Sequence, residues 1–209
     1  MFFASKSIGI PQEGLGEREA LRDEEWALVV RVREGDRCAF DLLVRRYRER
    51  LYGLVYHMIS NAADAADLTQ DIFIQAFRCI GSFRGKSSFF SWLYRIGVNK
   101  TLEHIRRHRR RQFFSVQAID EQGLGESFWR DISATEASDK SAYLSELQEK
   151  LNEALQRLSD KHRMVVVLYE IENLSHAEIA AVLKCSEGTV RSRLHYAKEQ
   201  LKEFLKEYA

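Results

Sequence analysis

Hydrophobic residues recur every three or four positions along most of the chain from Trp26 onward, which is the spacing of one face of an α-helix. After a break at Gly35 and Asp36, one such face carries Phe40, Leu43, Val44, Tyr47, Leu51 and Leu54. The sequence lacks valine- and threonine-rich runs with strand-like alternation. Its one proline, Pro11, precedes all of the periodic segments. The pattern therefore predicts an all-α fold.

Interruptions in the pattern divide the periodic segments into two groups. The first group lies within residues 24–112 and the second within residues 140–209. The intervening residues 113–139 have no sustained period and carry six acidic residues against one arginine. We therefore expect two small helical domains joined by a flexible acidic linker. Residues 1–23 mix glycine, proline, serine and charge without a period, which favours a flexible N-terminal arm.

Two closely spaced helix starts lie near the C-terminus. Ser175 and Glu178 have the spacing of a capping box, in which each side chain bonds the backbone of the other residue. A short apolar run then ends in a tight turn at residues 184–186, and Ser186 is a good N-cap for the next helix. A short helix, a tight turn and a second capped helix form the helix-turn-helix pattern.

The second helix of this pair has a buried side and an outer side. The stripe expected to be buried consists of Val190, Leu194, Ala197 and Leu201. Early residues off the stripe would face the major groove, where a helix-turn-helix reads base edges. Arg191 suits guanine, whereas Thr189 and Ser192 are less selective. The outer side carries Glu187, Arg191, Ser192, His195 and Lys198. The alternative is a helical hairpin whose outer side is only solvated.

Residues 81–112 are strongly basic, with nine lysines and arginines against one glutamate. Such a run favours nucleic acid, because neutralised phosphates release counterions. A helix expected from about Ser88 to Arg111 has a core stripe of Phe90, Leu93, Tyr94, Gly97, Val98, Thr101, Leu102 and Ile105. Its opposite side carries Phe89, Trp92, Arg95, Ile96, Asn99, Lys100 and Arg106. Rings beside cations are typical of proteins that bind single strands. The alternatives are that the rings pack against a neighbouring helix and that the cations are solvated.

The loop before this helix, GSFRGKSS, has an open backbone of glycines and serines. We expect Phe83, Arg84 and Lys86 to point outward from it. A base flipped out of a duplex needs such stacking and polar contacts. The loop is therefore a candidate site for an unpaired base.

The composition excludes several classes of protein. The 209 residues carry a net charge of +1, and the three cysteines lie far apart without CxxC spacing, which argues against disulfides and zinc. A signal peptide and an apolar stretch of about 20 residues are both missing, so we expect a cytoplasmic protein without membrane insertion. The histidines and acidic residues have no metal-ligand spacing, so we expect no enzyme, metal or cofactor.

Three segments together resemble the extracytoplasmic-function (ECF) sigma factors of the sigma-70 family, which contain only regions 2 and 4. DAADLTQDIFIQAFR (residues 64–78) resembles region 2.2, and FRGKSSFFSWLYRIGVNKTLEHIRRHRRR (residues 83–111) resembles the promoter-melting and −10 segment. Residues 158–201 resemble region 4. The segments stand in the order and at the spacing usual for the family.

The resemblance implies that residues 24–112 form region 2, which binds the β′ clamp helices of core RNA polymerase and melts the −10 element. It implies that residues 140–209 form region 4, on the −35 element and the β flap. The implied polymerase contacts are Asp64, Asp67, Gln70, Asp71 and Gln75. The implied −10 contacts are Phe83, Arg84, Lys86, Trp92, Tyr94, Arg95, Asn99, Lys100, Arg106 and Arg107. The implied −35 contacts are Glu187, Thr189, Arg191, Ser192, His195, Tyr196 and Lys198.

The resemblance also implies an anti-sigma factor as a partner, since family members are often held by one that covers both polymerase-binding surfaces. The acidic linker resembles the segment that threads the polymerase cleft, or it is a soluble tether. Three positions depart from the family pattern. Tyr196 stands where many members carry arginine, Ser159 replaces a common proline, and Asp71 replaces the commoner glutamate.

A stand-alone repressor or activator is the alternative function. It accounts for the helix-turn-helix but gives the basic aromatic helix no role. It predicts tight duplex binding by the protein alone, whereas the sigma hypothesis predicts weak promoter binding without core polymerase.

Overall fold

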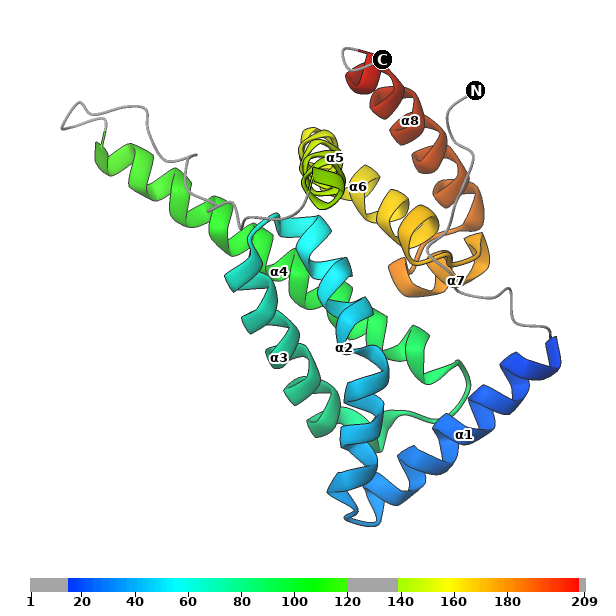
Figure 1. The fold of residues 1–209 in the computed structure, drawn as a ribbon. Helices are drawn as coiled ribbons and strands as arrows, with labels where there is room; N and C mark the ends of the chain where they lie inside the picture. Colours follow the sequence, from blue (N-terminus) through cyan, green and yellow to red (C-terminus); the bar gives the residue numbers. More distant parts are fainter. Residues whose placement is uncertain (1–14, 120–138, 207–209) are drawn as a thin grey trace.

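Every part of the chain that the structure describes is built from helices and turns (Figure 1). The computed structural model describes residues 15–119 and 139–206, and these ranges contain no strand. The all-α fold predicted from the hydrophobic pattern is confirmed. None of the helices in these ranges is both long and apolar enough to cross a membrane.

The helices form two groups along the chain. The first group contains α1 (Leu15–Arg33), α2 (Arg37–Ile59), α3 (Ala62–Cys79), a single 3-10 turn η1 (Ile80–Ser82) and α4 (Phe89–Ile119). The second group contains α5 (Asp139–Arg157), α6 (Asp160–Val166), the π-helical turn η2 (Val167–Ile171), α7 (His176–Leu183) and α8 (Glu187–Leu205). The two groups correspond to the two helical domains expected from the sequence.

Side-chain caps fix where several helices begin. Asp36 accepts a hydrogen bond from the third residue of α2, and Asn61 does the same for α3. Ser175 and Glu178 form the complete capping box at α7, and Ser186 caps α8. These caps satisfy backbone N–H groups that have no partner within the helix. The helix starts predicted at Ser175 and Ser186 are confirmed.

Three helix ends differ from the sequence-based expectation. Residues 15–23 belong to α1 where a flexible arm was expected, because LGEREALRD is rich in residues of high helix propensity. Residues 113–119 extend α4 into the expected linker, and α5 begins at Asp139. The rest of the arm and of the acidic linker, residues 1–14 and 120–138, lies outside the described residues.

Helix α2 forms the centre of the first group and packs against α1, α3 and α4. Leu43, Leu51 and Leu54 on α2 are fully buried. Gly97 on α4 allows the two helices to approach closely, because a Cβ atom at that position would lie 2.8 Å from Leu51 Cδ1. This close packing fixes α4, which carries most of the predicted −10 contacts, against the core of the first group.

The two groups of helices pack against each other through buried polar contacts. The Tyr94 hydroxyl on α4 donates a hydrogen bond to Glu172 Oε2 at 2.5 Å, and Arg50 Nε on α2 donates to the same oxygen at 3.3 Å. His57 Nδ1 and Asn152 Oδ1 lie 2.7 Å apart. Tyr94 has no exposed surface, and Glu172 is 5% exposed. The two domains therefore share one core in this structure.

Two titratable side chains in this interface make the stability of the fold depend on pH in opposite directions. Burial lowers the pKa of His57 below its ordinary value of 6.5, so its contribution is present above pH 6.5 and is lost as the pH falls through the folded-state pKa. Burial raises the pKa of Glu172 above its ordinary value of 4.5, although Tyr94 and Arg50 oppose the shift. The contribution of Glu172 is present below pH 4.5 and is lost as the pH rises through the folded-state pKa.

We therefore expect opposite effects of two amide variants on the slope of unfolding free energy against pH between 4.5 and 6.5. His57→Gln makes the slope less positive, because the unfolded wild type takes up a proton that the native ring resists. Glu172→Gln makes it more positive. Urea denaturation at several pH values measures both slopes, with His108→Gln on the exposed end of α4 as the control. Parallel slopes in the wild type and both variants would contradict the assignment.

Candidate nucleic-acid and partner interfaces

Helices α7 and α8 form the helix-turn-helix expected from the sequence. Lys184 ends α7 in the left-handed conformation, with φ of 52°, and the chain then turns into the Ser186 cap of α8. The four residues of the predicted stripe are buried, namely Val190, Leu194, Ala197 and Leu201. The turn and the stripe together leave the opposite side of α8 open to solvent.

The predicted −35 contacts lie on that open side of α8. Six of them are exposed and Thr189 is half-buried; the exposed ones are Glu187, Arg191, Ser192, His195, Tyr196 and Lys198. Arg191 Nη2 lies 3.2 Å from Glu187 Oε2 one turn earlier, and Lys198 Nζ lies 2.6 Å from Glu170 Oε1. Exposed ion pairs of this kind contribute little to stability, so phosphates and bases can replace them. Tyr196 is 61% exposed, the largest apolar exposure on this helix in the described residues.

The aromatic side chains of α4 lie deeper than predicted. Phe89 is 1% exposed and packs against Tyr47 and Phe83, so its place on the outer side was wrong. Trp92 is half-buried, with its ring centroid 5.4 Å from that of Phe83. The rings face neighbouring elements because the loop before α4 folds back over them. Of the four rings at positions 89, 90, 92 and 94, only that of Trp92 keeps part of its surface open to a ligand.

The loop between η1 and α4 also differs from the prediction in one residue. Phe83 is 4% exposed and points inward, while Arg84 and Lys86 are exposed as expected. The side chain of Phe83 is apolar and has three rings within reach, those of Trp26, Phe89 and Trp92. Burial in this cluster outweighs the openness of the glycine-rich backbone.

Tyr94 was predicted both in the core stripe of α4 and among the −10 contacts, and the structure places it in the core. The core stripe of α4 predicted burial, and the ring is fully buried with its hydroxyl bonded to Glu172 of the second group. Burial and the nearby carboxylate raise the pKa of Tyr94 well above its ordinary value, so the hydroxyl stays protonated and donates. In this conformation Tyr94 has no surface that DNA can contact, and its placement among the −10 contacts is corrected.

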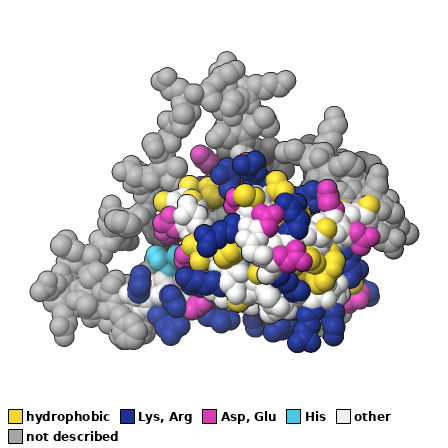
Figure 2. Space-filling model, turned by 90° about the horizontal axis from the view of Figure 1, so that it is seen from below, with side chains coloured by type: hydrophobic (Ala, Val, Ile, Leu, Met, Phe, Trp, Pro, Cys, Tyr) yellow, Lys and Arg dark blue, Asp and Glu magenta, His cyan; other side chains and the backbone are white. Residues whose placement is uncertain are grey.

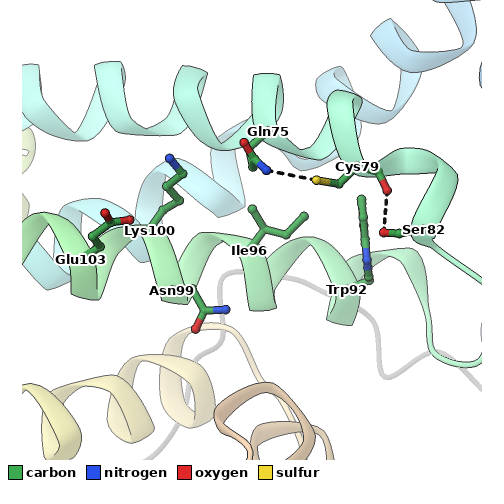
Figure 3. Close-up of a pocket in the computed structure, with 8 residues that line it drawn as sticks. All are labelled: Gln75, Cys79, Ser82, Trp92, Ile96, Asn99, Lys100 and Glu103. Atoms are coloured by element: carbon green, nitrogen blue, oxygen red, sulfur yellow. Dashed lines mark hydrogen bonds between the residues drawn. The ribbon is translucent and has the colours of Figure 1, made fainter.

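A pocket of about 410 Å³ lies between α3 and α4 (Figure 3). Gln75 and Cys79 line it from α3, and Trp92, Ile96 and Lys100 rise towards them from α4. Ser82, Asn99 and Glu103 complete the lining. Gln75 Nε2 lies 3.0 Å from Cys79 Sγ, which keeps the amide at the wall of the pocket. The pocket thus combines an aromatic ring, amides and a cation, the groups that bind an unpaired base and its phosphate.

Acidic and apolar side chains lie together on the exposed side of α3. Asp67, Gln70 and Asp71 are exposed, whereas Asp64 and Gln75 are half-buried. The prediction named these polar residues but missed two apolar neighbours on the same side, Ile74 and Phe77, which are 50% and 40% exposed. The signal for them was their position, since Ile74 follows Asp71 by three residues and Phe77 follows Ile74 by three, which places them on the same side of the helix. Exposed apolar side chains within a polar rim mark a protein-binding surface.

Basic side chains are spread over the molecule. Arg106, Arg107, Arg109, Arg110 and Arg111 are all exposed on α4. Figure 2 shows the molecule from below, with Lys and Arg side chains along the edges of this face and acidic and hydrophobic side chains between them.

Groups of three or more His, Cys, Asp or Glu arranged to hold a metal ion do not occur in the described ranges.

Comparison with known proteins gives the family. Residues 43–111 match sigma-70 region 2, and residues 148–201 match sigma-70 region 4. The RNA polymerase sigma-H factor of Pseudomonas aeruginosa is 37% identical over 182 residues, which are 86% of this chain and 93% of the relative. The chain is an ECF sigma factor. The ECF RNA polymerase sigma-E factor of Escherichia coli is likewise 37% identical, over 88% of this chain and 94% of its own length.

Solved structures resemble this sigma factor over both groups of helices. CnrH in complex with the cytosolic domain of CnrY is 25% identical with a TM-score of 0.67, and the match covers 90% of this chain and all of CnrH. The Bartonella quintana sigma factor RpoE in complex with the anti-sigma factor NepR is 27% identical with a TM-score of 0.61, over 80% of this chain and 96% of RpoE. The region 2 match contains the α3 surface and the pocket, and the region 4 match contains the outer side of α8.

Proposed function

We propose that this sigma factor binds core RNA polymerase through the exposed side of α3, reads the −35 element with α8 and holds the melted −10 element at α4. The surface of α3 carries the proposal. It exposes Ile74 and Phe77 beside Asp67 and Asp71 on one side of one helix. A stand-alone repressor that binds DNA through α7 and α8 would leave this surface without a role.

The α3 surface suits a partner with basic and apolar side chains. Two half-exposed apolar residues can enter a pocket on the partner, and the surrounding carboxylates select a positively charged rim. The family resemblance supports the β′ clamp helices as this partner and the β flap as the partner of region 4. The contacts on α3 are Asp64, Asp67, Gln70, Asp71, Ile74, Gln75 and Phe77.

The pocket between α3 and α4 suits one unpaired base of the −10 element. Trp92 supplies a stacking surface, Asn99 and Gln75 supply amide groups for a base edge, and Lys100 supplies charge for a phosphate. Arg106 and Arg107 continue the basic surface along α4, and Arg84, Lys86 and Arg95 are retained from the sequence-based set. Tyr94 is omitted because its ring is enclosed between the two groups of helices.

Region 4 presents α8 to the −35 element. The N-terminal end of α8 is polar and exposed, and Gly188 there has no side chain, so the helix can enter a major groove. Arg191 reads a base edge and Lys198 contacts a phosphate. Tyr196 occupies the position where many family members carry arginine, so the −35 sequence differs from theirs at the contacted base pair.

We further propose that an anti-sigma factor controls this sigma factor. RpoE of Bartonella quintana was solved with the anti-sigma factor NepR, and the similarity to this chain covers both regions. Here the two groups of helices also pack closely, through Tyr94, Arg50 and Glu172. A partner that stabilises such packing would keep region 2 and region 4 too close together to reach two separated promoter elements.

Run-off transcription with core polymerase on genomic fragments tests the proposal. We expect discrete transcripts that require this protein. We expect Ile74→Asp to abolish them by weakening core binding by about 100-fold, because an apolar side chain that the polymerase would cover becomes a charge. Core binding is measured in parallel with labelled protein. Leu42→Asp is the matched control, since Leu42 is 46% exposed on α2 and Ile74 is 50% exposed.

Two results would overturn the proposal. One is the absence of both initiation and core binding by the folded wild-type protein. The other is tight, sequence-specific duplex binding by the protein alone with no response to polymerase, which would identify a repressor or activator. Equal loss of core binding in Leu42→Asp and Ile74→Asp would remove α3 from the polymerase interface.

A further inference from the structure

One side of α1 lies against the loop that precedes α4 along most of its length. Residues 22, 25, 26 and 33 fall on this side of the helix, and each of them contacts the loop or the first residue of α4. The region 2 match begins at residue 43, so it does not include α1. The function proposed for the chain gives α1 no role.

Arg33, at the end of α1, holds the start of the loop by its backbone. Its guanidinium donates to the carbonyl oxygen of Ile80 at 3.2 Å, to that of Gly81 at 3.3 Å and to that of Phe83. The first of these carbonyls follows the end of α3 and also accepts the backbone N–H of Phe83 at 3.2 Å, so Arg33 adds a second hydrogen bond to it. A planar guanidinium with five N–H donors can serve several acceptors at once. Arg33 thereby fixes the direction in which the chain leaves α3.

Trp26 supports the middle of the loop from about two turns further back along α1. Its ring lies 5.9 Å from that of Phe83, and the Arg33 guanidinium lies 5.3 Å from the Trp26 ring. Gly85 has φ of 67°, and a Cβ atom at Gly85 would lie 3.1 Å from the Trp26 ring. A side chain would therefore be strained here and would push the loop away from α1. Glycine lets the backbone rest directly on the indole.

Two more residues of α1 hold the end of the loop. Arg22 Nη2 donates to the carbonyl oxygen of Gly85 at 2.7 Å. Glu25, which is 2% exposed, accepts a hydrogen bond from the backbone N–H of Phe89 at 3.3 Å. Phe89 is the first residue of α4, so the carboxylate also stabilises the N-terminus of that helix. The loop is therefore bonded to α1 at its start, middle and end.

We propose that α1 is a positioning element for promoter melting, with Arg33 and Trp26 as its central residues. They set the conformation of residues 80–88, which places Ser82 and Trp92 at the pocket and presents Arg84 and Lys86 to the displaced DNA strand. The ligand that depends on them is an unpaired base of the −10 element with its phosphate. This inference rests on the proposed function, and it adds residues that touch neither DNA nor polymerase.

Physical reasons favour positioning over simple support of the fold. Residues 83–88 lack helical structure, so without α1 the backbone of residues 84–87 loses its hydrogen bond to Arg22, and Phe83 keeps only its contacts with Phe89 and Trp92 on α4. Binding of a base by such a loop would first have to order the loop. The conformational entropy lost in this ordering would make promoter melting less favourable. Binding to core polymerase and to the −35 duplex involves other surfaces, α3 and α8, and would be unaffected.

The test uses the full-length sigma factor with core polymerase and Arg33→Met. Three quantities are measured on one promoter: core affinity, binding to the closed duplex, and opening of the −10 element by 2-aminopurine fluorescence. We expect opening to fall by about tenfold or more, in line with lost base capture, while core affinity and duplex binding stay within about twofold. Arg33→Lys is expected to recover part of the opening, because an ammonium group can still donate to these carbonyls.

Matched variants separate positioning from general destabilisation. Arg46→Met removes a different ion pair of α1, that of Arg46 with Glu24 at 2.8 Å, and leaves the loop contacts intact. It is expected to open the promoter like the wild type. Gly85→Ala disturbs the contact between α1 and the loop from the loop side. It is expected to reduce promoter opening as Arg33→Met does. Gly85→Ala also covers the case in which Arg33→Met does not fold, which thermal unfolding reveals.

The outcomes distinguish this inference from the function it rests on. A wild-type protein that binds core polymerase but opens no promoter would overturn both. A wild-type protein that opens promoters, with Gly85→Ala and folded Arg33→Met opening them equally well, would overturn only the role of α1. Parallel loss of core affinity, duplex binding and opening would show that α1 serves the fold and would also overturn the inference.

Discussion

Replacing Arg163 by methionine is expected to lower the free energy of unfolding by about 3–5 kcal/mol, as for removal of one member of a buried charged network. Arg163 is 5% exposed, and burial lowers the pKa of its guanidinium. It donates to four carbonyl oxygens, those of Met58 at 2.5 Å, Leu155 at 2.8 Å, Gln156 at 2.8 Å and Leu158 at 3.1 Å. Methionine has similar length but no donor, so these acceptors would stay buried without their partner.

Urea denaturation at neutral pH measures this loss. Lys161→Met is the control, because Lys161 is exposed on the same helix and its replacement should change stability by no more than about 0.5 kcal/mol. Arg163→Lys should lie between the two, since lysine keeps the charge but cannot reach four acceptors in a plane. A loss below about 1 kcal/mol for Arg163→Met would show that water satisfies the carbonyls in the variant.

Arg163 also joins the two groups of helices, because Met58 belongs to α2, whereas Leu155 and Gln156 lie in the last turn of α5 and Leu158 lies between α5 and α6. The same substitution is therefore expected to loosen the contact between region 2 and region 4. Glu172 makes an equivalent connection from region 4 to Arg50 and Tyr94. These are the contacts that must break for the two regions to reach separate promoter elements.

The features predicted well from the sequence depend on residues close together along the chain. The capping box of Ser175 and Glu178, the cap at Ser186 and the stripe on α8 each involve a few turns of one helix. Their spacing follows from helix geometry alone. The outer side of α8 was predicted for the same reason, since a buried stripe on an isolated helix identifies its opposite side.

The features that were missed depend on contacts between distant parts of the chain. Phe83 is buried because Trp26 lies above it, and Trp26 stands 57 positions earlier in the sequence. Arg163 and Glu172 are charged residues that periodicity alone would place in solvent, yet both are buried by polar partners on α2 and α4. No local pattern records such partners. Ile74 is the opposite case, an apolar residue that stays half exposed although the helix pattern would favour its burial.

Replacing Arg191 by alanine is expected to reduce initiation from a promoter with a −35 element by about 10- to 100-fold, the loss expected for one bidentate contact to guanine. Arg191 is exposed near the start of α8, and its Nη2 lies 3.2 Å from Glu187 Oε2 on the same helix. That weak pair orients the guanidinium outward and yields readily to a base edge, because a bidentate contact in the groove offers two shorter bonds. Core polymerase affinity should not change, since α3 is untouched.

The pattern of loss across promoter variants decides what Arg191 contacts. If it reads a base, the wild type discriminates among the four base pairs at one −35 position and Arg191→Ala treats them nearly alike. A uniform loss across all variants, with a weaker dependence on salt, would assign Arg191 to a phosphate and contradict base reading. Lys202→Ala on the far part of α8 is the control, being exposed but outside the contact set. The same promoter set tested with Tyr196→Arg shows whether the family arginine restores a base preference that tyrosine lacks.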